Sequence, residues 1–164
     1  MQIGESYVGE GLEAAHINSV LGERSGPVGV AWTTALASPT HGHAPFVTII
    51  RPGLAVQPPT LFVNKAGIGG ERHAEMTWGA AQAGVAAGVA DAVAQEVISA
   101  DWVGELVIIA AVWVNPLAAD AKAVFDNNRA AMCGALISGL KGGPSVDAVD
   151  GARDDPWNPF YRPR

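Results

Sequence analysis

Residues 105–114 read Glu-Leu-Val-Ile-Ile-Ala-Ala-Val-Trp-Val, and Leu106 to Val114 is the longest apolar run in the chain. A continuous apolar run of this length, rich in β-branched residues, predicts a β-strand that is buried on both faces. The run is well short of the ~20 residues that a membrane-spanning helix needs. We therefore expect residues 105–114 to lie in the core of a soluble protein.

Further strands and helices are predicted on both sides of this run. Residues 3–8, 14–21, 46–51 and 61–65 have the composition of strands, and residues 29–37 that of a short helix. Residues 70–97 are predicted to form a long helix, because Val85, Val89, Val93 and Val97 recur at every fourth position. A second long helix is expected to begin at Asn115-Pro116 and to end at Gly142-Gly143. The predicted fold is α+β, with a mixed β-sheet packed against two long helices.

We expect one domain, residues 1–141, followed by a tail, residues 142–164. The tail is rich in proline and carries Trp157, Phe160 and Tyr161 without any periodicity. Such a segment is either a disordered terminus or a segment whose aromatic side chains pack on the domain or on a neighbouring subunit.

Composition narrows the class of protein. The formal net charge is -6 and no cluster of Lys and Arg is present, which argues against a nucleic-acid partner. Cys133 is the only cysteine, so an intramolecular disulfide is impossible and a reducing compartment is expected. The first residues lack the basic and apolar regions of a signal peptide. We expect a cytoplasmic protein that does not associate with membranes.

The histidines are weak candidates for a metal site. His41 and His43 are two residues apart, but they follow a proline and flank a glycine, and no carboxylate or thiol is close to them in sequence. His73 lies in a charged stretch that is expected to open a helix, so a solvated surface position is predicted for it. We therefore expect no metal cofactor.

Three other residues have ordinary interpretations when each is taken alone. His16 lies in an apolar predicted strand, where a histidine is most often a hydrogen-bonded core residue. Lys65 ends a predicted strand and Gln82 lies in a predicted helix, and both positions suit solvated side chains.

Taken together, these residues lie in motifs that resemble one family. The motifs are Gly9-Glu10-Gly11 with Glu13-Ala14-Ala15-His16-Ile17, then His41-Gly42, then Pro58-Pro59-Thr60-Leu61-Phe62-Val63-Asn64-Lys65, then residues 79–86 and 89–94. This ordered set resembles the formaldehyde-activating enzymes from about Gly9 to Leu140. The family condenses formaldehyde with tetrahydromethanopterin to methylene-tetrahydromethanopterin and water in methylotrophic metabolism. The resemblance further implies a fold similar to the second domain of ribosomal protein S5, and ring-shaped homopentamers with active sites between subunits.

The resemblance also implies roles for individual residues. The family's catalytic histidine falls on His16, and its pterin-contacting lysine and glutamine fall on Lys65 and Gln82. At three further contact positions the chain differs: Asn18 replaces an aspartate, Gly67 replaces a threonine and Val47 replaces a leucine. Two alternatives stay open because of Asn18 and Gly67. One is a non-catalytic carrier or sensor that binds pterin or formaldehyde, and the other is an enzyme for a different aldehyde or pterin, such as a tetrahydrofolate.

Overall fold

The apolar run forms β7 (Leu106–Trp113), the middle strand of a five-stranded sheet in a computed structural model that describes residues 1–158 and 161. The strand order is β1-β2-β7-β6-β3. Strand β7 is antiparallel to β2 and parallel to β6, so the sheet is mixed. The other strands of this sheet are β1 (Gln2–Val8), β2 (Ala15–Glu23), β3 (Pro45–Val47) and β6 (Thr60–Asn64). A separate hairpin consists of β4 (Ile49–Arg51) and β5 (Leu54–Ala55).

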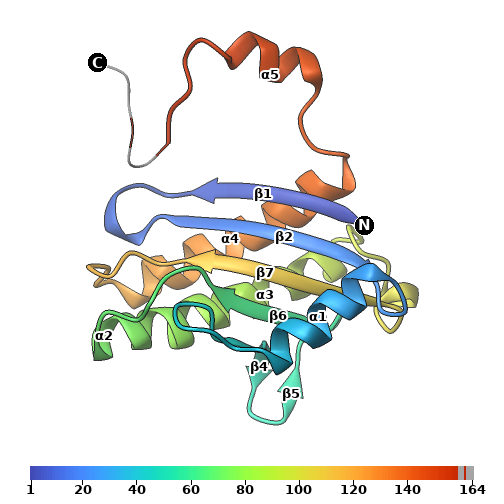
Figure 1. Ribbon diagram of the computed structural model, residues 1–164, viewed down its shortest axis with the longest axis horizontal. Coiled ribbons are helices and arrows are strands. Elements are labelled where there is room, and N and C mark those ends of the chain that lie inside the picture. The colour runs from blue at the N-terminus through green and yellow to red at the C-terminus, as the bar shows by residue number, and fades with distance from the viewer. Residues whose placement is uncertain (159–160, 162–164) are drawn as a thin grey trace.

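The helices are α1 (Pro27–Ala37), α2 (Glu71–Ala74), α3 (Gln82–Ala94), α4 (Ala121–Leu140) and α5 (Val146–Ala152). Helix α4 packs on β1 and β2 and against α3, whereas α1 packs on β2 and β7. Figure 1 shows α3 and α4 behind the sheet and α1 in front of it. The α+β class and the mixed sheet of the sequence prediction are therefore confirmed.

The two faces of β7 differ in burial. Ile108, Ala110 and Val112 are fully buried in the core beneath α3 and α4. Ala111 and Trp113 point to the opposite face and are only half-buried. The prediction that both faces are buried was therefore wrong for this end of the strand, because α1 covers the opposite face only in part.

The predicted long helix over residues 70–97 is divided into three consecutive segments. Helix α2 is followed by a π-helical segment, Glu75–Ala81, and then by α3. Valine periodicity reports the buried face of a helix but not a local change in its hydrogen-bond pattern, so the sequence did not indicate this division.

The start of α4 was also predicted wrongly. Asn115 does not cap this helix; its Oδ1 accepts a hydrogen bond from the Leu117 N–H at 2.9 Å and closes a turn instead. Asp120 is the cap, since its Oδ1 accepts hydrogen bonds from the N–H groups of Lys122 and Ala123 at 2.9 and 3.1 Å.

Among the described residues, no helix combines the length and the apolar character needed to cross a membrane.

One ion pair joins α3 to α4 and gives a pH-dependent prediction. Arg129 donates two hydrogen bonds to the Asp91 carboxylate, at 2.6 and 2.7 Å, and these bonds lower the pKa of Asp91. A carboxyl whose pKa is lower in the folded state stabilises the fold above its unfolded pKa and loses that contribution as the pH falls through the folded pKa. Asp91→Asn should therefore lower the melting temperature at pH 7 by about 2 °C, since exposed ion pairs contribute little.

The pH series checks the sign of this effect. The difference in melting temperature between Asp91→Asn and the parent should be full above about pH 5 and shrink as the pH falls further. Asp126→Asn is the matched control, because Asp126 pairs with the highly exposed Lys122 within α4. A difference at Asp91 that persists unchanged at low pH would show that the ion pair is not its source.

Candidate functional site

Four polar side chains come together where β1 and β2 form a hairpin. In the antiparallel register, Glu5 lies opposite Asn18 and Tyr7 lies opposite His16. Side chains alternate between faces along a strand, so all four point to the face of the sheet away from α4. Asn18 and His16 are two positions apart on β2, so they share this face.

The His16 imidazole is held by two neighbours from β1. Its Nε2 lies 3.1 Å from Oε1 of Glu5, and its ring meets the Tyr7 ring edge-on, with centroids 6.3 Å apart. The His16 side chain is 38% exposed and that of Glu5 is 59% exposed, so both groups are accessible to a ligand. His16 is therefore not the buried core histidine that its apolar surroundings suggested.

Lys65 reaches the same face from the end of β6. Its Nζ donates a hydrogen bond of 2.6 Å to Oδ1 of Asn18, across the intervening strand β7. Burial lowers the pKa of Lys65, and the nearby charge of Glu5 partly offsets this effect. An imidazole, a carboxylate, an amide and a partly buried amine thus lie together on one sheet face.

A pocket of about 210 Å³ lies over His16. Its lining residues are Glu5, Tyr7, His16, Trp157 and Asn158, which we call the histidine pocket. Tyr7 and Trp157 give it aromatic walls, and Glu5 and His16 give it acid–base groups. Such a combination of apolar walls and a few convergent polar groups is typical of small-molecule sites.

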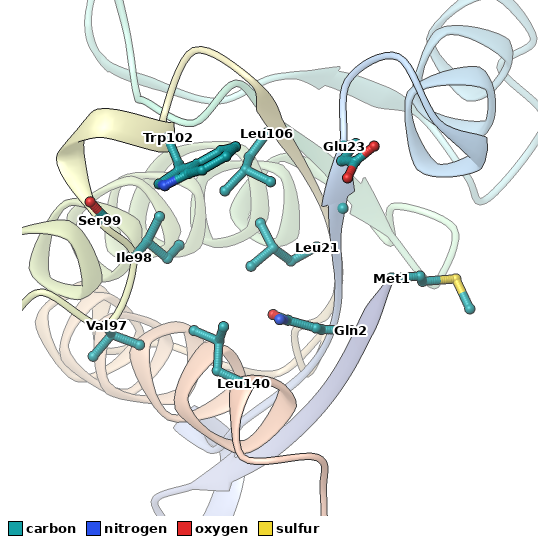
Figure 2. Close-up of a pocket in the computed structure, with 11 residues that line it drawn as sticks. Met1, Gln2, Leu21, Glu23, Val97, Ile98, Ser99, Trp102, Leu106 and Leu140 are labelled. Carbon is teal, nitrogen blue, oxygen red and sulfur yellow. The ribbon is translucent and has the colours of Figure 1, made fainter.

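A second cavity, of about 270 Å³, lies at the other end of the hairpin, and we call it the distal cavity. Figure 2 shows Leu21, Leu106 and Leu140 pointing into it, with Gln2 reaching in from β1 and Trp102 at its rim. No histidine or lysine lines this cavity. It therefore offers no acid–base pair comparable with that of the histidine pocket.

Comparison with known proteins identifies the family. The model of the formaldehyde-activating enzymes (Fae) matches residues 3–161, which is nearly the whole chain. The chain belongs to the formaldehyde-activating enzyme family. The resemblance seen in the sequence motifs is thereby confirmed.

Several relatives are bifunctional enzymes that carry the family name. The bifunctional enzyme Fae/Hps of Archaeoglobus fulgidus is 35% identical over 159 residues, which cover 97% of this chain and 40% of the relative. The enzymes of the same name from Methanococcoides burtonii and Methanosarcina barkeri are 40% and 39% identical, over 91% and 90% of this chain. In each case the chain spans about two-fifths of the relative's length.

Of the other residues carried over from the family, neither Val47 nor Gln82 lines the histidine pocket. Val47 ends β3, which is separated from β2 by β7 and β6, about 14 Å at the usual strand spacing. Gln82 begins α3 and is 8% exposed, and its Oε1 accepts a hydrogen bond of 2.7 Å from the Ile49 N–H. A Cβ on Gly67 would lie 3.4 Å from Nε2 of His41. The structure thus brings His16, Asn18 and Lys65 together and leaves Val47 and Gln82 elsewhere.

Two histidine predictions can be compared with the structure. His41 and His43 lie in a turn closed by backbone hydrogen bonds between Thr40 and His43. His73 is 3% exposed, so its predicted surface position was wrong. Its Nδ1 accepts a hydrogen bond from the Gly69 N–H and its Nε2 contacts the Val114 carbonyl, both at 3.0 Å. The sequence did not indicate that His73 is buried, because its sequence neighbours are charged and because Val114 comes near it only in the folded chain.

Sequence reasoning missed four residues of the histidine pocket: Glu5, Tyr7, Trp157 and Asn158. The first two could have been found, since an antiparallel hairpin between residues 3–8 and 14–21 places positions 5 and 7 beside positions 18 and 16. Trp157 could not have been placed, because no local pattern tells where a tail without periodicity returns to the domain.

Proposed function

We propose that the chain catalyses the condensation of formaldehyde with tetrahydromethanopterin to methylene-tetrahydromethanopterin and water, with His16 as the general acid. The observation that carries this proposal is the imidazole–carboxylate pair of His16 and Glu5 in an open pocket of a chain from this family. The reaction class is a carbon–nitrogen lyase of one-carbon metabolism.

The chemistry requires an acid at one step. An amine nitrogen of the reduced pterin adds to the formaldehyde carbon and gives a carbinolamine. The hydroxyl of this adduct leaves as water once it receives a proton, and a second pterin nitrogen then bonds to the same carbon and releases a proton. Hydroxide is a poor leaving group, so an imidazolium that is positioned to protonate it lowers the barrier. General acids of this kind typically raise the rate by a factor of ~100 to ~10,000.

The remaining carried-over residues are proposed to bind the pterin. Lys65 and Asn18 lie beside His16, and they would form hydrogen bonds to the polar edge of the pterin. Val47, Gly67 and Gln82 would contact the pterin from elsewhere. Val47 lies on β3, three strands from β2, and Gln82 is bonded to Ile49, so neither residue lines the histidine pocket. This separation supports a site between neighbouring subunits, in the homopentamer that the family resemblance implies.

Several coarser expectations belong to the same proposal. We propose a cytoplasmic protein of methylotrophic metabolism with a fold similar to the second domain of ribosomal protein S5. Residues 142–164 are proposed to be an appendage of the domain. Within residues 1–158 and 161, no three His, Cys, Asp or Glu side chains are grouped as metal ligands would be. The proposed reaction uses the pterin as co-substrate and assigns no step to a metal.

Two alternatives rest on the residues that differ from the family. Asn18 carries no charge where the family has an aspartate, and Gly67 has no side chain where the family has a threonine. These changes favour either a carrier or sensor without catalysis, or a different pterin or aldehyde substrate.

One rate comparison separates these readings. Purified protein is mixed with formaldehyde and either tetrahydromethanopterin or tetrahydrofolate, and the rate is compared with the spontaneous condensation. We expect acceleration with tetrahydromethanopterin and much less with tetrahydrofolate. Tight pterin binding without acceleration would favour the carrier or sensor, and acceleration only with another pterin would favour the changed substrate.

Glu5 is proposed as a positioning residue for His16. A carboxylate that holds one ring nitrogen fixes the orientation of the imidazole and decides which nitrogen faces the substrate. Glu5→Gln should lower kcat about ten-fold and leave KM for the pterin nearly unchanged. Glu5→Asp should recover part of kcat, and neither variant should unfold, because the side chain is largely exposed. Loss of pterin affinity with kcat intact would instead make Glu5 a binding residue.

A further inference from the structure

The segment after α4 returns to the histidine pocket. Helix α4 ends at Leu140, and α5 follows with Ser145 as its cap and with no buried residue. In Figure 1, α5 lies beyond the β1 edge of the sheet, away from α3. Beyond α5, Trp157 and Asn158 line the same pocket as His16. Trp157 thus lies against the domain, which is one of the two alternatives that the sequence left open for the tail. Phe160 lies outside the described residues.

Trp157 gives this pocket a wall that the sheet alone does not supply. Trp157 borders the pocket and is 54% exposed, so part of its surface faces solvent. Tyr7 is engaged edge-on with His16, and its ring therefore supports the imidazole from the β1 side. Trp157 comes from a different part of the chain, and it lines the same pocket as these two rings.

The size and chemistry of the pocket favour a flat ring system. Its volume of about 210 Å³ is below the ~300–1,000 Å³ of sites that enclose a drug-sized ligand, so one chain has room for a ring and not for a whole extended pterin. Indole rings stack well on flat heterocyclic rings such as the pyrimidine ring of a reduced pterin, and the polar edge of such a ring would lie toward His16. A small aldehyde such as formaldehyde has no surface that could use this wall.

We propose that Trp157 is a substrate-binding residue that stacks on the ring system of the reduced pterin over His16. The identity of the ligand, a reduced pterin, rests on the proposed function. The new element is a contact between this ligand and a residue of the C-terminal tail. Trp157 would set affinity for the pterin and not the rate of the proton transfer.

The test compares Trp157→Ala and Trp157→Phe with Trp102→Ala. Trp102 is the matched control, since it is 61% exposed and lies at the distal cavity. Trp157→Ala should raise KM for tetrahydromethanopterin about five- to ten-fold, with kcat within two-fold and KM for formaldehyde unchanged. Trp157→Phe should remain close to the parent, and Trp102→Ala should match it.

Equilibrium binding separates this inference from the proposed function. Calorimetric titration with tetrahydromethanopterin, without formaldehyde, should show the same five- to ten-fold loss for Trp157→Ala. If the protein does not accelerate the condensation but Trp157→Ala alone weakens pterin binding, the inference holds and the proposed enzyme activity fails. Equal affinities for Trp157→Ala and the parent, equal losses in the two alanine variants, or no binding by the parent would overturn the inference.

Discussion

Replacing His16 with alanine should abolish the acceleration of methylene-tetrahydromethanopterin formation, a loss of ~100- to ~10,000-fold. The alanine variant would lack the proton donor for the departing hydroxyl, while Lys65 and Asn18 would remain in place to bind the pterin. Stopped-flow or spectrophotometric rates above the spontaneous background measure this loss. Pterin affinity, measured by titration, should change less than about three-fold, because affinity depends on the other contacts.

Two controls distinguish catalysis from folding. His43→Ala removes another imidazole, from an exposed position in the turn that follows Thr40, and should retain the parent rate. The melting temperature of His16→Ala should stay close to that of the parent, since the side chain is 38% exposed. A parent-like rate above background for His16→Ala would mean that His16 only supports the hairpin.

Replacing Gly88 with alanine should destabilise the fold strongly. Helices α3 and α4 lie close together at Gly84 and Gly88, where a Cβ on Gly88 would collide with the Arg129 carbonyl oxygen. A Cβ on Gly84 would lie 2.5 Å from the Phe125 carbonyl oxygen, also too close. Backbone atoms cannot rotate away as a side chain can, so the helices must separate. Overpacking of this kind costs ~2 kcal/mol, or about 4–8 °C in Tm.

The same substitution at Gly79 provides the control. Gly79 is also helical, but a Cβ there meets no heavy atom within 4 Å among the groups around it. Gly79→Ala should leave Tm unchanged or raise it slightly, because alanine favours the helix by up to ~1 kcal/mol. Thermal unfolding followed by circular dichroism measures both variants. A parent-like Tm for Gly88→Ala would contradict the close α3–α4 contact.

Most strands were predictable because their signal is local, as in the apolar run at residues 105–114. The single strand predicted over residues 46–51 was wrong, since the structure divides these residues between β3 and β4, which belong to different sheets. The π-helical segment Glu75–Ala81 and the cap at Asp120 were not predicted. Both features depend on which of several nearby hydrogen bonds forms, and the sequence does not show this. For the cap, Asn115-Pro116 gives an equally good signal for a helix start.

The site could be predicted only in part for a related reason. His16, Asn18 and Lys65 came from motifs, and the structure places them on one face. What the motifs did not reveal is that Asn18 accepts a hydrogen bond from Lys65 while the carboxylate beside His16 belongs to Glu5. These contacts connect three strands, and their pairing is decided by the sheet register and not by spacing along the chain.

A crystal structure with bound tetrahydromethanopterin or its methylene product would show directly whether the His16 face of the sheet is the pterin site. We expect the ring system in the histidine pocket, between Trp157 and the His16 imidazole, with Lys65 within hydrogen-bond reach of the pterin. Pterin density in the distal cavity beside Trp102, or on any surface without contact to His16, would contradict it.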